Sequence, residues 1–195
     1  MTAKSLKQAA LTLFAESGYD GVSLSEIAKS VGIKTPSIYA HFESKEQLFL
    51  ALLDDAVHEE HEKFTLLLQN MEDQPPIERF YAAFRFFTDL DGLTNGQSFL
   101  KRTMLMPPRN LEERLRSEFI AYEDVFTGPM LKLLRECAGT EADNEERVER
   151  LLALFYAVID GLLVEHKLYD TELYRRRQTL LWGWLQHALR SEQAG

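Results

Sequence analysis

The chain has 195 residues and a formal net charge of −9, with 45% hydrophobic and 27% charged residues. This length suits one compact unit or two small ones, and the composition is typical of a globular protein. The single cysteine, Cys137, excludes an intramolecular disulfide and favours a reducing compartment. We find no signal peptide and no run of eighteen apolar residues, so the sequence predicts a cytoplasmic protein and not a secreted or membrane-spanning one.

The first predicted helix covers residues 4–17. Its apolar side chains recur on one face, and Gly18 follows as a helix-ending residue. That face carries Leu6, Ala9, Ala10, Leu13 and Phe14. We expect this face to form the core of a small N-terminal domain and to have no direct role in function.

Two short helices are predicted next, over residues 24–31 and from Pro36 to about residue 42. Ser23 and Glu26 have the spacing of a capping box at the start of the first helix. Gly32 accepts the left-handed conformation that ends many helices. We expect Thr35 to cap the second helix, with Pro36 at its first position, where an N–H is not needed.

A helix, a glycine turn and a second short helix form the pattern of a helix-turn-helix, whose second helix enters the DNA major groove. Ile38 and Phe42 are expected to point inward, and the residues around them to face solvent. From periodicity alone, an ordinary three-helix packing unit that binds no nucleic acid is equally compatible, because helix–glycine–helix corners are common.

Residues 5–53 resemble the DNA-binding domain of the TetR family of bacterial transcriptional regulators. The matching residues lie at fixed spacings: Leu13-Phe14, Gly18-Tyr19, Ser23, Ile27-Ala28, Val31-Gly32, Tyr39, His41-Phe42, Lys45 and Leu48. The resemblance implies an all-α fold, with a helix-turn-helix domain at residues 1–50 and a helical effector-binding and dimerisation body at residues 51–195. It also implies a repressor that binds a palindromic DNA operator as a homodimer.

The predicted DNA contacts fall into two groups. The exposed start and face of the second short helix are assigned to base edges, and these residues are Thr35, Pro36, Ser37 and Ala40. The resemblance implies that a second group grips phosphates, and this group is Ser23, Ser25, Tyr39, His41 and Lys45. Lys34, just before the helix, completes the set. Residues 1–50 hold five lysines and five acidic residues, so the charge of −9 falls on the remainder and would orient the neutral head towards DNA.

A long helix is predicted from residue 45 to about residue 71, because Ser44 can cap it and no breaker follows before Pro75. At 1.5 Å per residue it would extend about 40 Å and join the head rigidly to the body. His58, His61 and Glu62 share faces of this helix. The two histidines are three residues apart, which is not the spacing of the H-E-x-x-H zinc motif. We predict a solvated face here, with neither metal nor cofactor.

Further helices are predicted over residues 77–90, 97–105, 110–138, 145–169 and 171–191, with Gly128-Pro129 kinking or breaking the third of them. Residues 80–130 are rich in aromatic side chains and methionine, a composition found in cores and in adaptable apolar pockets. In the TetR family a small-molecule effector binds inside this body. The candidate ligand-binding residues are Phe84, Phe87, Phe99, Arg102, Met104, Tyr122, Phe126 and Tyr156.

The last two helices carry apolar stripes that are wide for helices covering a core on one side only. The resemblance implies that they pair with their copies in a homodimer, and a monomer with two deeply buried helices is the alternative. The predicted interface residues are Leu151, Phe155, Val158, Gly161, Leu162, Leu181, Trp184 and Leu185.

No catalytic residue is predicted. Cys137 has no evident histidine partner, and the sequence contains neither a glycine-rich phosphate loop nor a nucleophile elbow. Two other classes of protein remain open: a helical metal-dependent enzyme that uses His58 and Glu62, and a carrier of apolar ligands that does not bind DNA.

Overall fold

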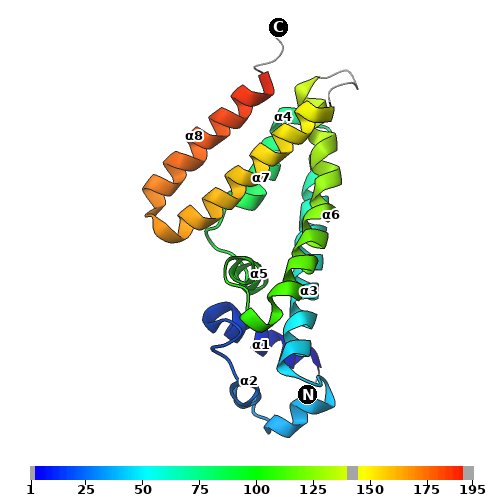
Figure 1. The fold of residues 1–195 in the computed structure, drawn as a ribbon, viewed down its shortest axis with the longest axis vertical. Helices are drawn as coiled ribbons and strands as arrows, with labels where there is room; N and C mark the ends of the chain where they lie inside the picture. The colour runs from blue at the N-terminus through cyan, green and yellow to red at the C-terminus, as the bar shows by residue number, and fades with distance from the viewer. Residues whose placement is uncertain (1–2, 140–144, 191–195) are drawn as a thin grey trace. The chain divides into compact units, whose positions relative to one another are not determined.

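The structure, a computed structural model, describes residues 3–139 and 145–190, and every regular element in these ranges is helical. Figure 1 labels the α-helices along the chain. In chain order they are α1 (Ala3–Ser17), α2 (Leu24–Ser30), η1 (Thr35–Ala40), α3 (Lys45–Asn70), α4 (Pro76–Thr88), α5 (Asn95–Leu105), η2 (Arg109–Leu111), α6 (Glu112–Ala138), α7 (Glu145–Leu168) and α8 (Thr171–Arg190). The predicted all-α class is confirmed. None of these described helices combines the length and the apolar character needed to cross a bilayer.

The helices form two compact units. The first contains the chain up to His61 together with Gly92–Ile120, and the second contains Glu62–Asp91 together with the chain from Ala121 onward. The predicted head, residues 1–50, therefore lies wholly in the first unit, which also takes α5 and the start of α6. The long helices α3 and α6 each contribute residues to both units.

The core of the first unit forms where α1 packs against α2 and α5. Leu6, Ala10 and Phe14 of α1 are completely buried, as the helical spacing predicted. The Phe14 ring lies 5.2 Å from the Phe49 ring, and Phe49 lies 5.0 Å from Phe99 of α5, between ring centroids. Edge-to-face packing of this kind adds to the hydrophobic stabilisation of a core. The aromatic rings thus join α1, α3 and α5 in one core.

A buried ion pair also joins α3 to α5 in the first unit. Glu60 is 1% exposed, and its Oε1 lies 3.8 Å from Nζ of Lys101. Gln97 donates from Nε2 to the other carboxylate oxygen at 3.1 Å. Oε1 has no hydrogen-bond partner, and desolvation lowers the pKa of Lys101, against the opposing effect of Glu60. Burying both charges ties the two helices to one arrangement, because either charge alone would be far less favourable.

The second unit has an aromatic core in which α4 packs on α7 and α8. Phe87 of α4 lies 5.4 Å from Phe126 of α6 and 6.0 Å from Phe155 of α7, between ring centroids. Trp182 of α8 lies 5.4 Å from Phe80 of α4. Five aromatic side chains from residues 80–130 are buried in this unit: Phe80, Phe84, Phe87, Tyr122 and Phe126.

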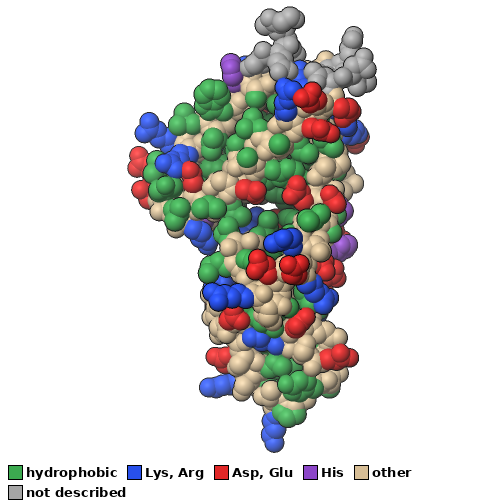
Figure 2. Space-filling view, viewed as in Figure 1, with side chains coloured by type: hydrophobic (Ala, Val, Ile, Leu, Met, Phe, Trp, Pro, Cys, Tyr) green, Lys and Arg blue, Asp and Glu red, His purple; other side chains and the backbone are tan. Residues whose placement is uncertain are grey.

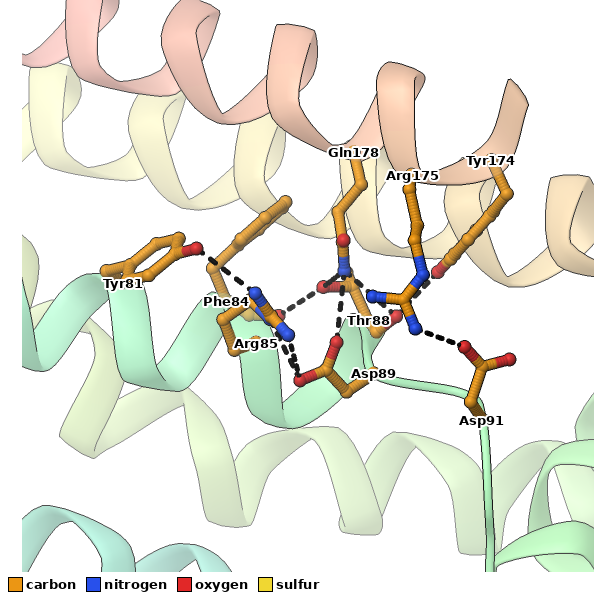
Figure 3. A network of polar contacts seen from close by, with 9 residues as sticks. All are labelled: Tyr81, Phe84, Arg85, Thr88, Asp89, Asp91, Tyr174, Arg175 and Gln178. Atoms are coloured by element: carbon orange, nitrogen blue, oxygen red, sulfur yellow. Dashed lines mark hydrogen bonds and ion pairs between the residues drawn. The ribbon is translucent and has the colours of Figure 1, made fainter. Parts of the chain in front are cut away.

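Polar side chains of α8 hold the end of α4 (Figure 3). The carbonyl oxygen of Thr88 accepts hydrogen bonds from the Tyr174 hydroxyl at 2.6 Å and from Nε2 of Gln178 at 3.2 Å. Arg175 then binds Asp91 at 2.6 Å, just beyond that end. Helix ends leave carbonyl groups unpaired, and here α8 satisfies one of them, which fixes α8 against α4.

Two details of α6 differ from the sequence prediction. The predicted start at Asn110 is instead a 3-10 turn, η2, and α6 begins at Glu112. Pro129 does not break α6, which continues to Ala138. A proline removes one backbone hydrogen bond, and burial of Met130, Leu133 and Leu134 just after it outweighs that loss. The predicted loop at residues 139–144 lies almost entirely outside the described residues.

Candidate nucleic-acid interface

The helix-turn-helix begins at the capping box predicted for α2. The Ser23 hydroxyl oxygen accepts from the Glu26 N–H at 3.2 Å, and the Ser23 N–H donates to Oε2 of Glu26 at 2.7 Å. The Ser23 hydroxyl also donates to Oε2 of Glu26 at 2.7 Å, and this bond, together with the one from the Ser23 N–H, lowers the pKa of the Glu26 carboxyl. At the other end, Gly32 adopts φ 72°, so the turn into the next element needs the left-handed conformation that glycine tolerates. The cap and the glycine turn are confirmed.

The second short helix differs from its prediction in type and length. It is a 3-10 helix from Thr35 to Ala40, and Lys34, not Thr35, occupies the N-cap without a side-chain hydrogen bond. Its bonds span three residues, as from Ser37 N–H to Lys34 O at 2.9 Å. A six-residue segment can complete few α-helical bonds, so the tighter winding suits it.

The exposed face of η1 matches the predicted DNA-facing set. Ile38 is completely buried and Phe42 nearly so, as expected. Thr35 is half-buried, whereas the remaining members of the face are exposed, and these are Pro36, Ser37, Tyr39, Ala40 and His41. Ser25 and Lys34 are exposed as well. The head therefore presents small polar groups and one aromatic hydroxyl, which can contact base edges and phosphates.

Lys45, the first residue of α3, has contacts that sequence reasoning missed. Its Nζ donates to the carbonyl oxygens of Tyr19 at 2.9 Å and Val22 at 3.0 Å. It also lies 4.0 Å from the centroid of the Tyr19 ring. The ammonium thus has partners inside the protein, and the phosphate contact assigned to Lys45 stays a prediction.

The candidate ligand-binding residues do not gather in one unit. Phe99, Arg102 and Met104 belong to the first unit, because α5 packs on α1. Phe99 packs there on Phe49, and the Arg102 guanidinium lies beside Gly18, where an added Cβ would be 3.0 Å from Nε. The other five belong to the second unit, and they are Phe84, Phe87, Tyr122, Phe126 and Tyr156. The structure thus divides the candidate set between the two units, and ligand binding by these residues stays a prediction.

Five of the eight predicted dimer residues are part of the chain's own core. Leu151, Phe155, Val158, Leu162 and Leu185 are all buried within the single chain. Gly161 and Trp184 are exposed, and Leu181 is half-buried. The buried five are not available to a second copy, because α7 and α8 turn this face towards α4.

Of the apolar residues that α7 and α8 expose, sequence reasoning named Gly161 and Trp184 and missed the others. On α7 they recur every three or four residues: Leu154, Ala157, Gly161, Val164 and Leu168. On α8, Leu180 and Trp184 are 57% and 68% exposed, and with Gly183 and His187 they line a surface hollow of about 290 Å³. Figure 2 shows hydrophobic side chains gathered over these two helices. We call this surface the α7–α8 stripe. The spacing of its α7 residues is visible in the sequence.

The residues considered for metal binding or catalysis are His58, Glu62 and Cys137. In residues 3–139 and 145–190, no three histidine, cysteine or acidic side chains are placed to hold a metal ion. Burial, with a smaller contribution from Glu136, raises the pKa of the Cys137 thiol to about 12. A nucleophilic cysteine needs the thiolate form, and a thiol with that pKa is protonated at neutral pH.

The fold and this exposed face define an all-helical protein with an N-terminal helix-turn-helix. Residues 6–52 match the model of the family described as bacterial regulatory proteins, tetR family. This N-terminal domain thus matches the TetR family, and the resemblance read from residues 5–53 is confirmed.

A curated relative and two solved structures are similar to larger parts of the chain. The relative is the biofilm operon icaADBC HTH-type negative transcriptional regulator IcaR of Staphylococcus epidermidis, 37% identical over 124 residues. The match covers 59% of this chain and 65% of the relative, so it spans slightly less than two thirds of that protein.

The two solved structures share the fold along nearly the whole chain. One is a TetR-family transcriptional regulator from Streptomyces coelicolor, with a TM-score of 0.73 and 20% identity, covering 96% of this chain and 94% of that one. The other is the transcriptional regulator FadR from Bacillus subtilis in complex with stearoyl-CoA, with a TM-score of 0.66 and 19% identity. That match covers 97% and 98% of the two chains.

Proposed function

We propose that the protein is a cytoplasmic DNA-binding transcriptional repressor that recognises a palindromic operator as a homodimer. The observation that carries this proposal is the face of η1: Ile38 anchors the helix in the core, while Ser37 and its exposed neighbours face solvent. A rigid helix with exposed small polar groups suits the reading of base edges. The similarity to a negative regulator supports repression as the direction of control.

Selection from a pool of random double-stranded DNA tests this function. We expect the full chain to enrich an inverted repeat whose half-sites lie about one helical turn apart or somewhat more, because a twofold dimer presents two equivalent heads. Sequences recovered without any enriched motif would instead favour a ligand carrier that does not bind DNA.

Ser37 is the sharpest test of base recognition within this face. It is exposed and lies in the first turn of η1. Replacing Ser37 with Ala is expected to reduce discrimination at particular base pairs of the selected operator by about 1–3 kcal/mol, with little change in salt dependence. Competition binding against single-base operator variants measures this discrimination. Glu43→Ala, at an exposed residue outside η1, serves as the control, and equal effects of the two variants would contradict the assignment.

We propose the α7–α8 stripe as the homodimer interface. Apolar side chains at successive helical turns, with Gly161 open to close approach, give a continuous face on α7. Leu180, Trp184 and the hollow between them continue that face on α8. A twofold axis would bring each stripe against its own copy, so one surface supplies both halves of the interface.

We propose that an apolar or amphipathic small molecule controls DNA binding through the second unit. Support comes from its adaptable aromatic core, where Tyr156 and Thr127 share a hydrogen bond of 3.0 Å at a half-buried position. FadR, a structural neighbour, binds stearoyl-CoA. Because α3 and α6 each contribute to both units, a ligand that favours one arrangement of these helices can change the affinity for DNA. Thermal shift and operator binding with long-chain acyl-CoA as the first probe test this control.

A further inference from the structure

Lys45 is the one predicted phosphate contact whose charged group is turned into the protein. Its ammonium donates to two backbone carbonyls, those of Tyr19 and Val22, at 2.9 and 3.0 Å. It also lies over the face of the Tyr19 ring, a favourable position for a cation because the ring face carries partial negative charge. The ammonium therefore has three neighbours within the protein: two carbonyl oxygens and the face of an aromatic ring.

The two carbonyls bracket the turn between α1 and α2. Tyr19 follows Gly18 at the end of α1, and its ring packs on Phe14 and on Phe49 of α3. Val22 is buried and directly precedes Ser23, the N-cap of α2. By holding both carbonyls, the first residue of α3 fixes where α2 begins.

This position determines the orientation of the DNA-facing helix. The chain runs from Ser23 through α2 and the glycine turn directly into η1. A change in the α1–α2 turn would therefore rotate α2 and shift η1 with it. Loss of two charge-assisted hydrogen bonds would also leave two carbonyls without these partners, which destabilises the turn.

We propose that Lys45 is a positioning residue. Its ammonium holds the α1–α2 turn against α3 and thereby sets the orientation of η1, and it does not contact phosphate. This inference rests on the proposed DNA-binding function. Lys29 and Lys34, which are exposed in the helix-turn-helix, are then the residues that neutralise phosphate charge. The inference assigns a structural role to Lys45 and an electrostatic role to these two lysines.

Salt dependence distinguishes the two roles. For Lys45→Met, the positioning role predicts an unchanged slope of log K against log salt, a lower Tm, and a smaller ratio of specific to non-specific affinity. Lys45→Arg should recover part of that ratio, because a guanidinium can also donate to two carbonyls. The matched control Lys34→Met should lower the slope by about 0.9 per subunit with Tm unchanged. A slope lowered by about 0.9 per subunit in Lys45→Met, at unchanged Tm, would overturn the inference.

A measurement on the unaltered protein covers the case in which Lys45→Met fails to fold. Amine acetylation followed by mass spectrometry should modify Lys45 more slowly than Lys29 and Lys34 in the free protein. Adding operator DNA should then protect Lys29 and Lys34 and leave Lys45 unchanged. Fast acetylation of Lys45 in the free protein, suppressed by DNA, would contradict a positioning role. If no DNA is bound at all, the proposed function fails, while the reactivity of free Lys45 still tests its internal contacts.

Discussion

The Trp184→Glu variant is expected to be a folded monomer that binds a full operator far more weakly than the unaltered protein. Trp184 is 68% exposed in the single chain, so a glutamate there costs the protomer little stability. In the proposed dimer, a buried tryptophan contributes about 2 kcal/mol or more to the free energy of association. Each subunit supplies one Trp184, so the variant loses this contribution twice. The dimer should therefore weaken by roughly a thousandfold. Sedimentation equilibrium measures this change.

The matched control is Thr179→Glu, which introduces the same charge at an exposed residue of α8 outside the α7–α8 stripe. It should remain dimeric. Leu162→Glu is not a suitable test, because Leu162 is fully buried in its own chain and a glutamate there would unfold the protomer. A dimeric Trp184→Glu protein, or a monomeric unaltered protein at micromolar concentration, would refute this interface.

Replacing Lys101 with Met is expected to lower the free energy of unfolding by about 3–5 kcal/mol, because it leaves the buried Glu60 carboxylate without its counter-charge. The double variant Glu60→Gln/Lys101→Met should be much less destabilised, since both charges are then absent. Lys132→Met, at an exposed residue of α6, is the matched control and should change stability little. Urea titration provides these free energies.

A double variant as unstable as the single Lys101→Met variant would show that the buried pair does not couple α3 to α5.

Local sequence signals predicted the local features of the fold. The Ser23–Glu26 capping box, the Gly32 turn and the inward side chains of η1 follow from patterns within a few residues of one another, and the structure has them. The helix type of η1 was not predictable in this way, because a six-residue segment satisfies the cues of both an α-helix and a 3-10 helix.

Features that depend on long-range packing could not be predicted. Nothing near Lys101 in the sequence indicates that α5 packs on α1, or that its ammonium meets Glu60. The contacts of Lys45 could not be predicted for the same reason, because its partners Tyr19 and Val22 precede it by more than twenty residues. On α7, both faces carry apolar residues, so periodicity could not show which face turns to the chain's own core. Leu162 and Val164 are both branched aliphatic residues of α7, yet Leu162 is buried and Val164 is exposed.

A hydroxyl-radical footprint of the full chain on its selected operator tests the central claim most directly. A twofold pair of helix-turn-helix heads predicts two protected patches on one face of the duplex, related by a dyad and centred about 34–36 Å apart or somewhat more. The Trp184→Glu variant should lose both patches together at concentrations where the unaltered protein protects them. A single patch, or protection that does not depend on DNA sequence, would contradict the claim that this chain reads DNA as a symmetric dimer.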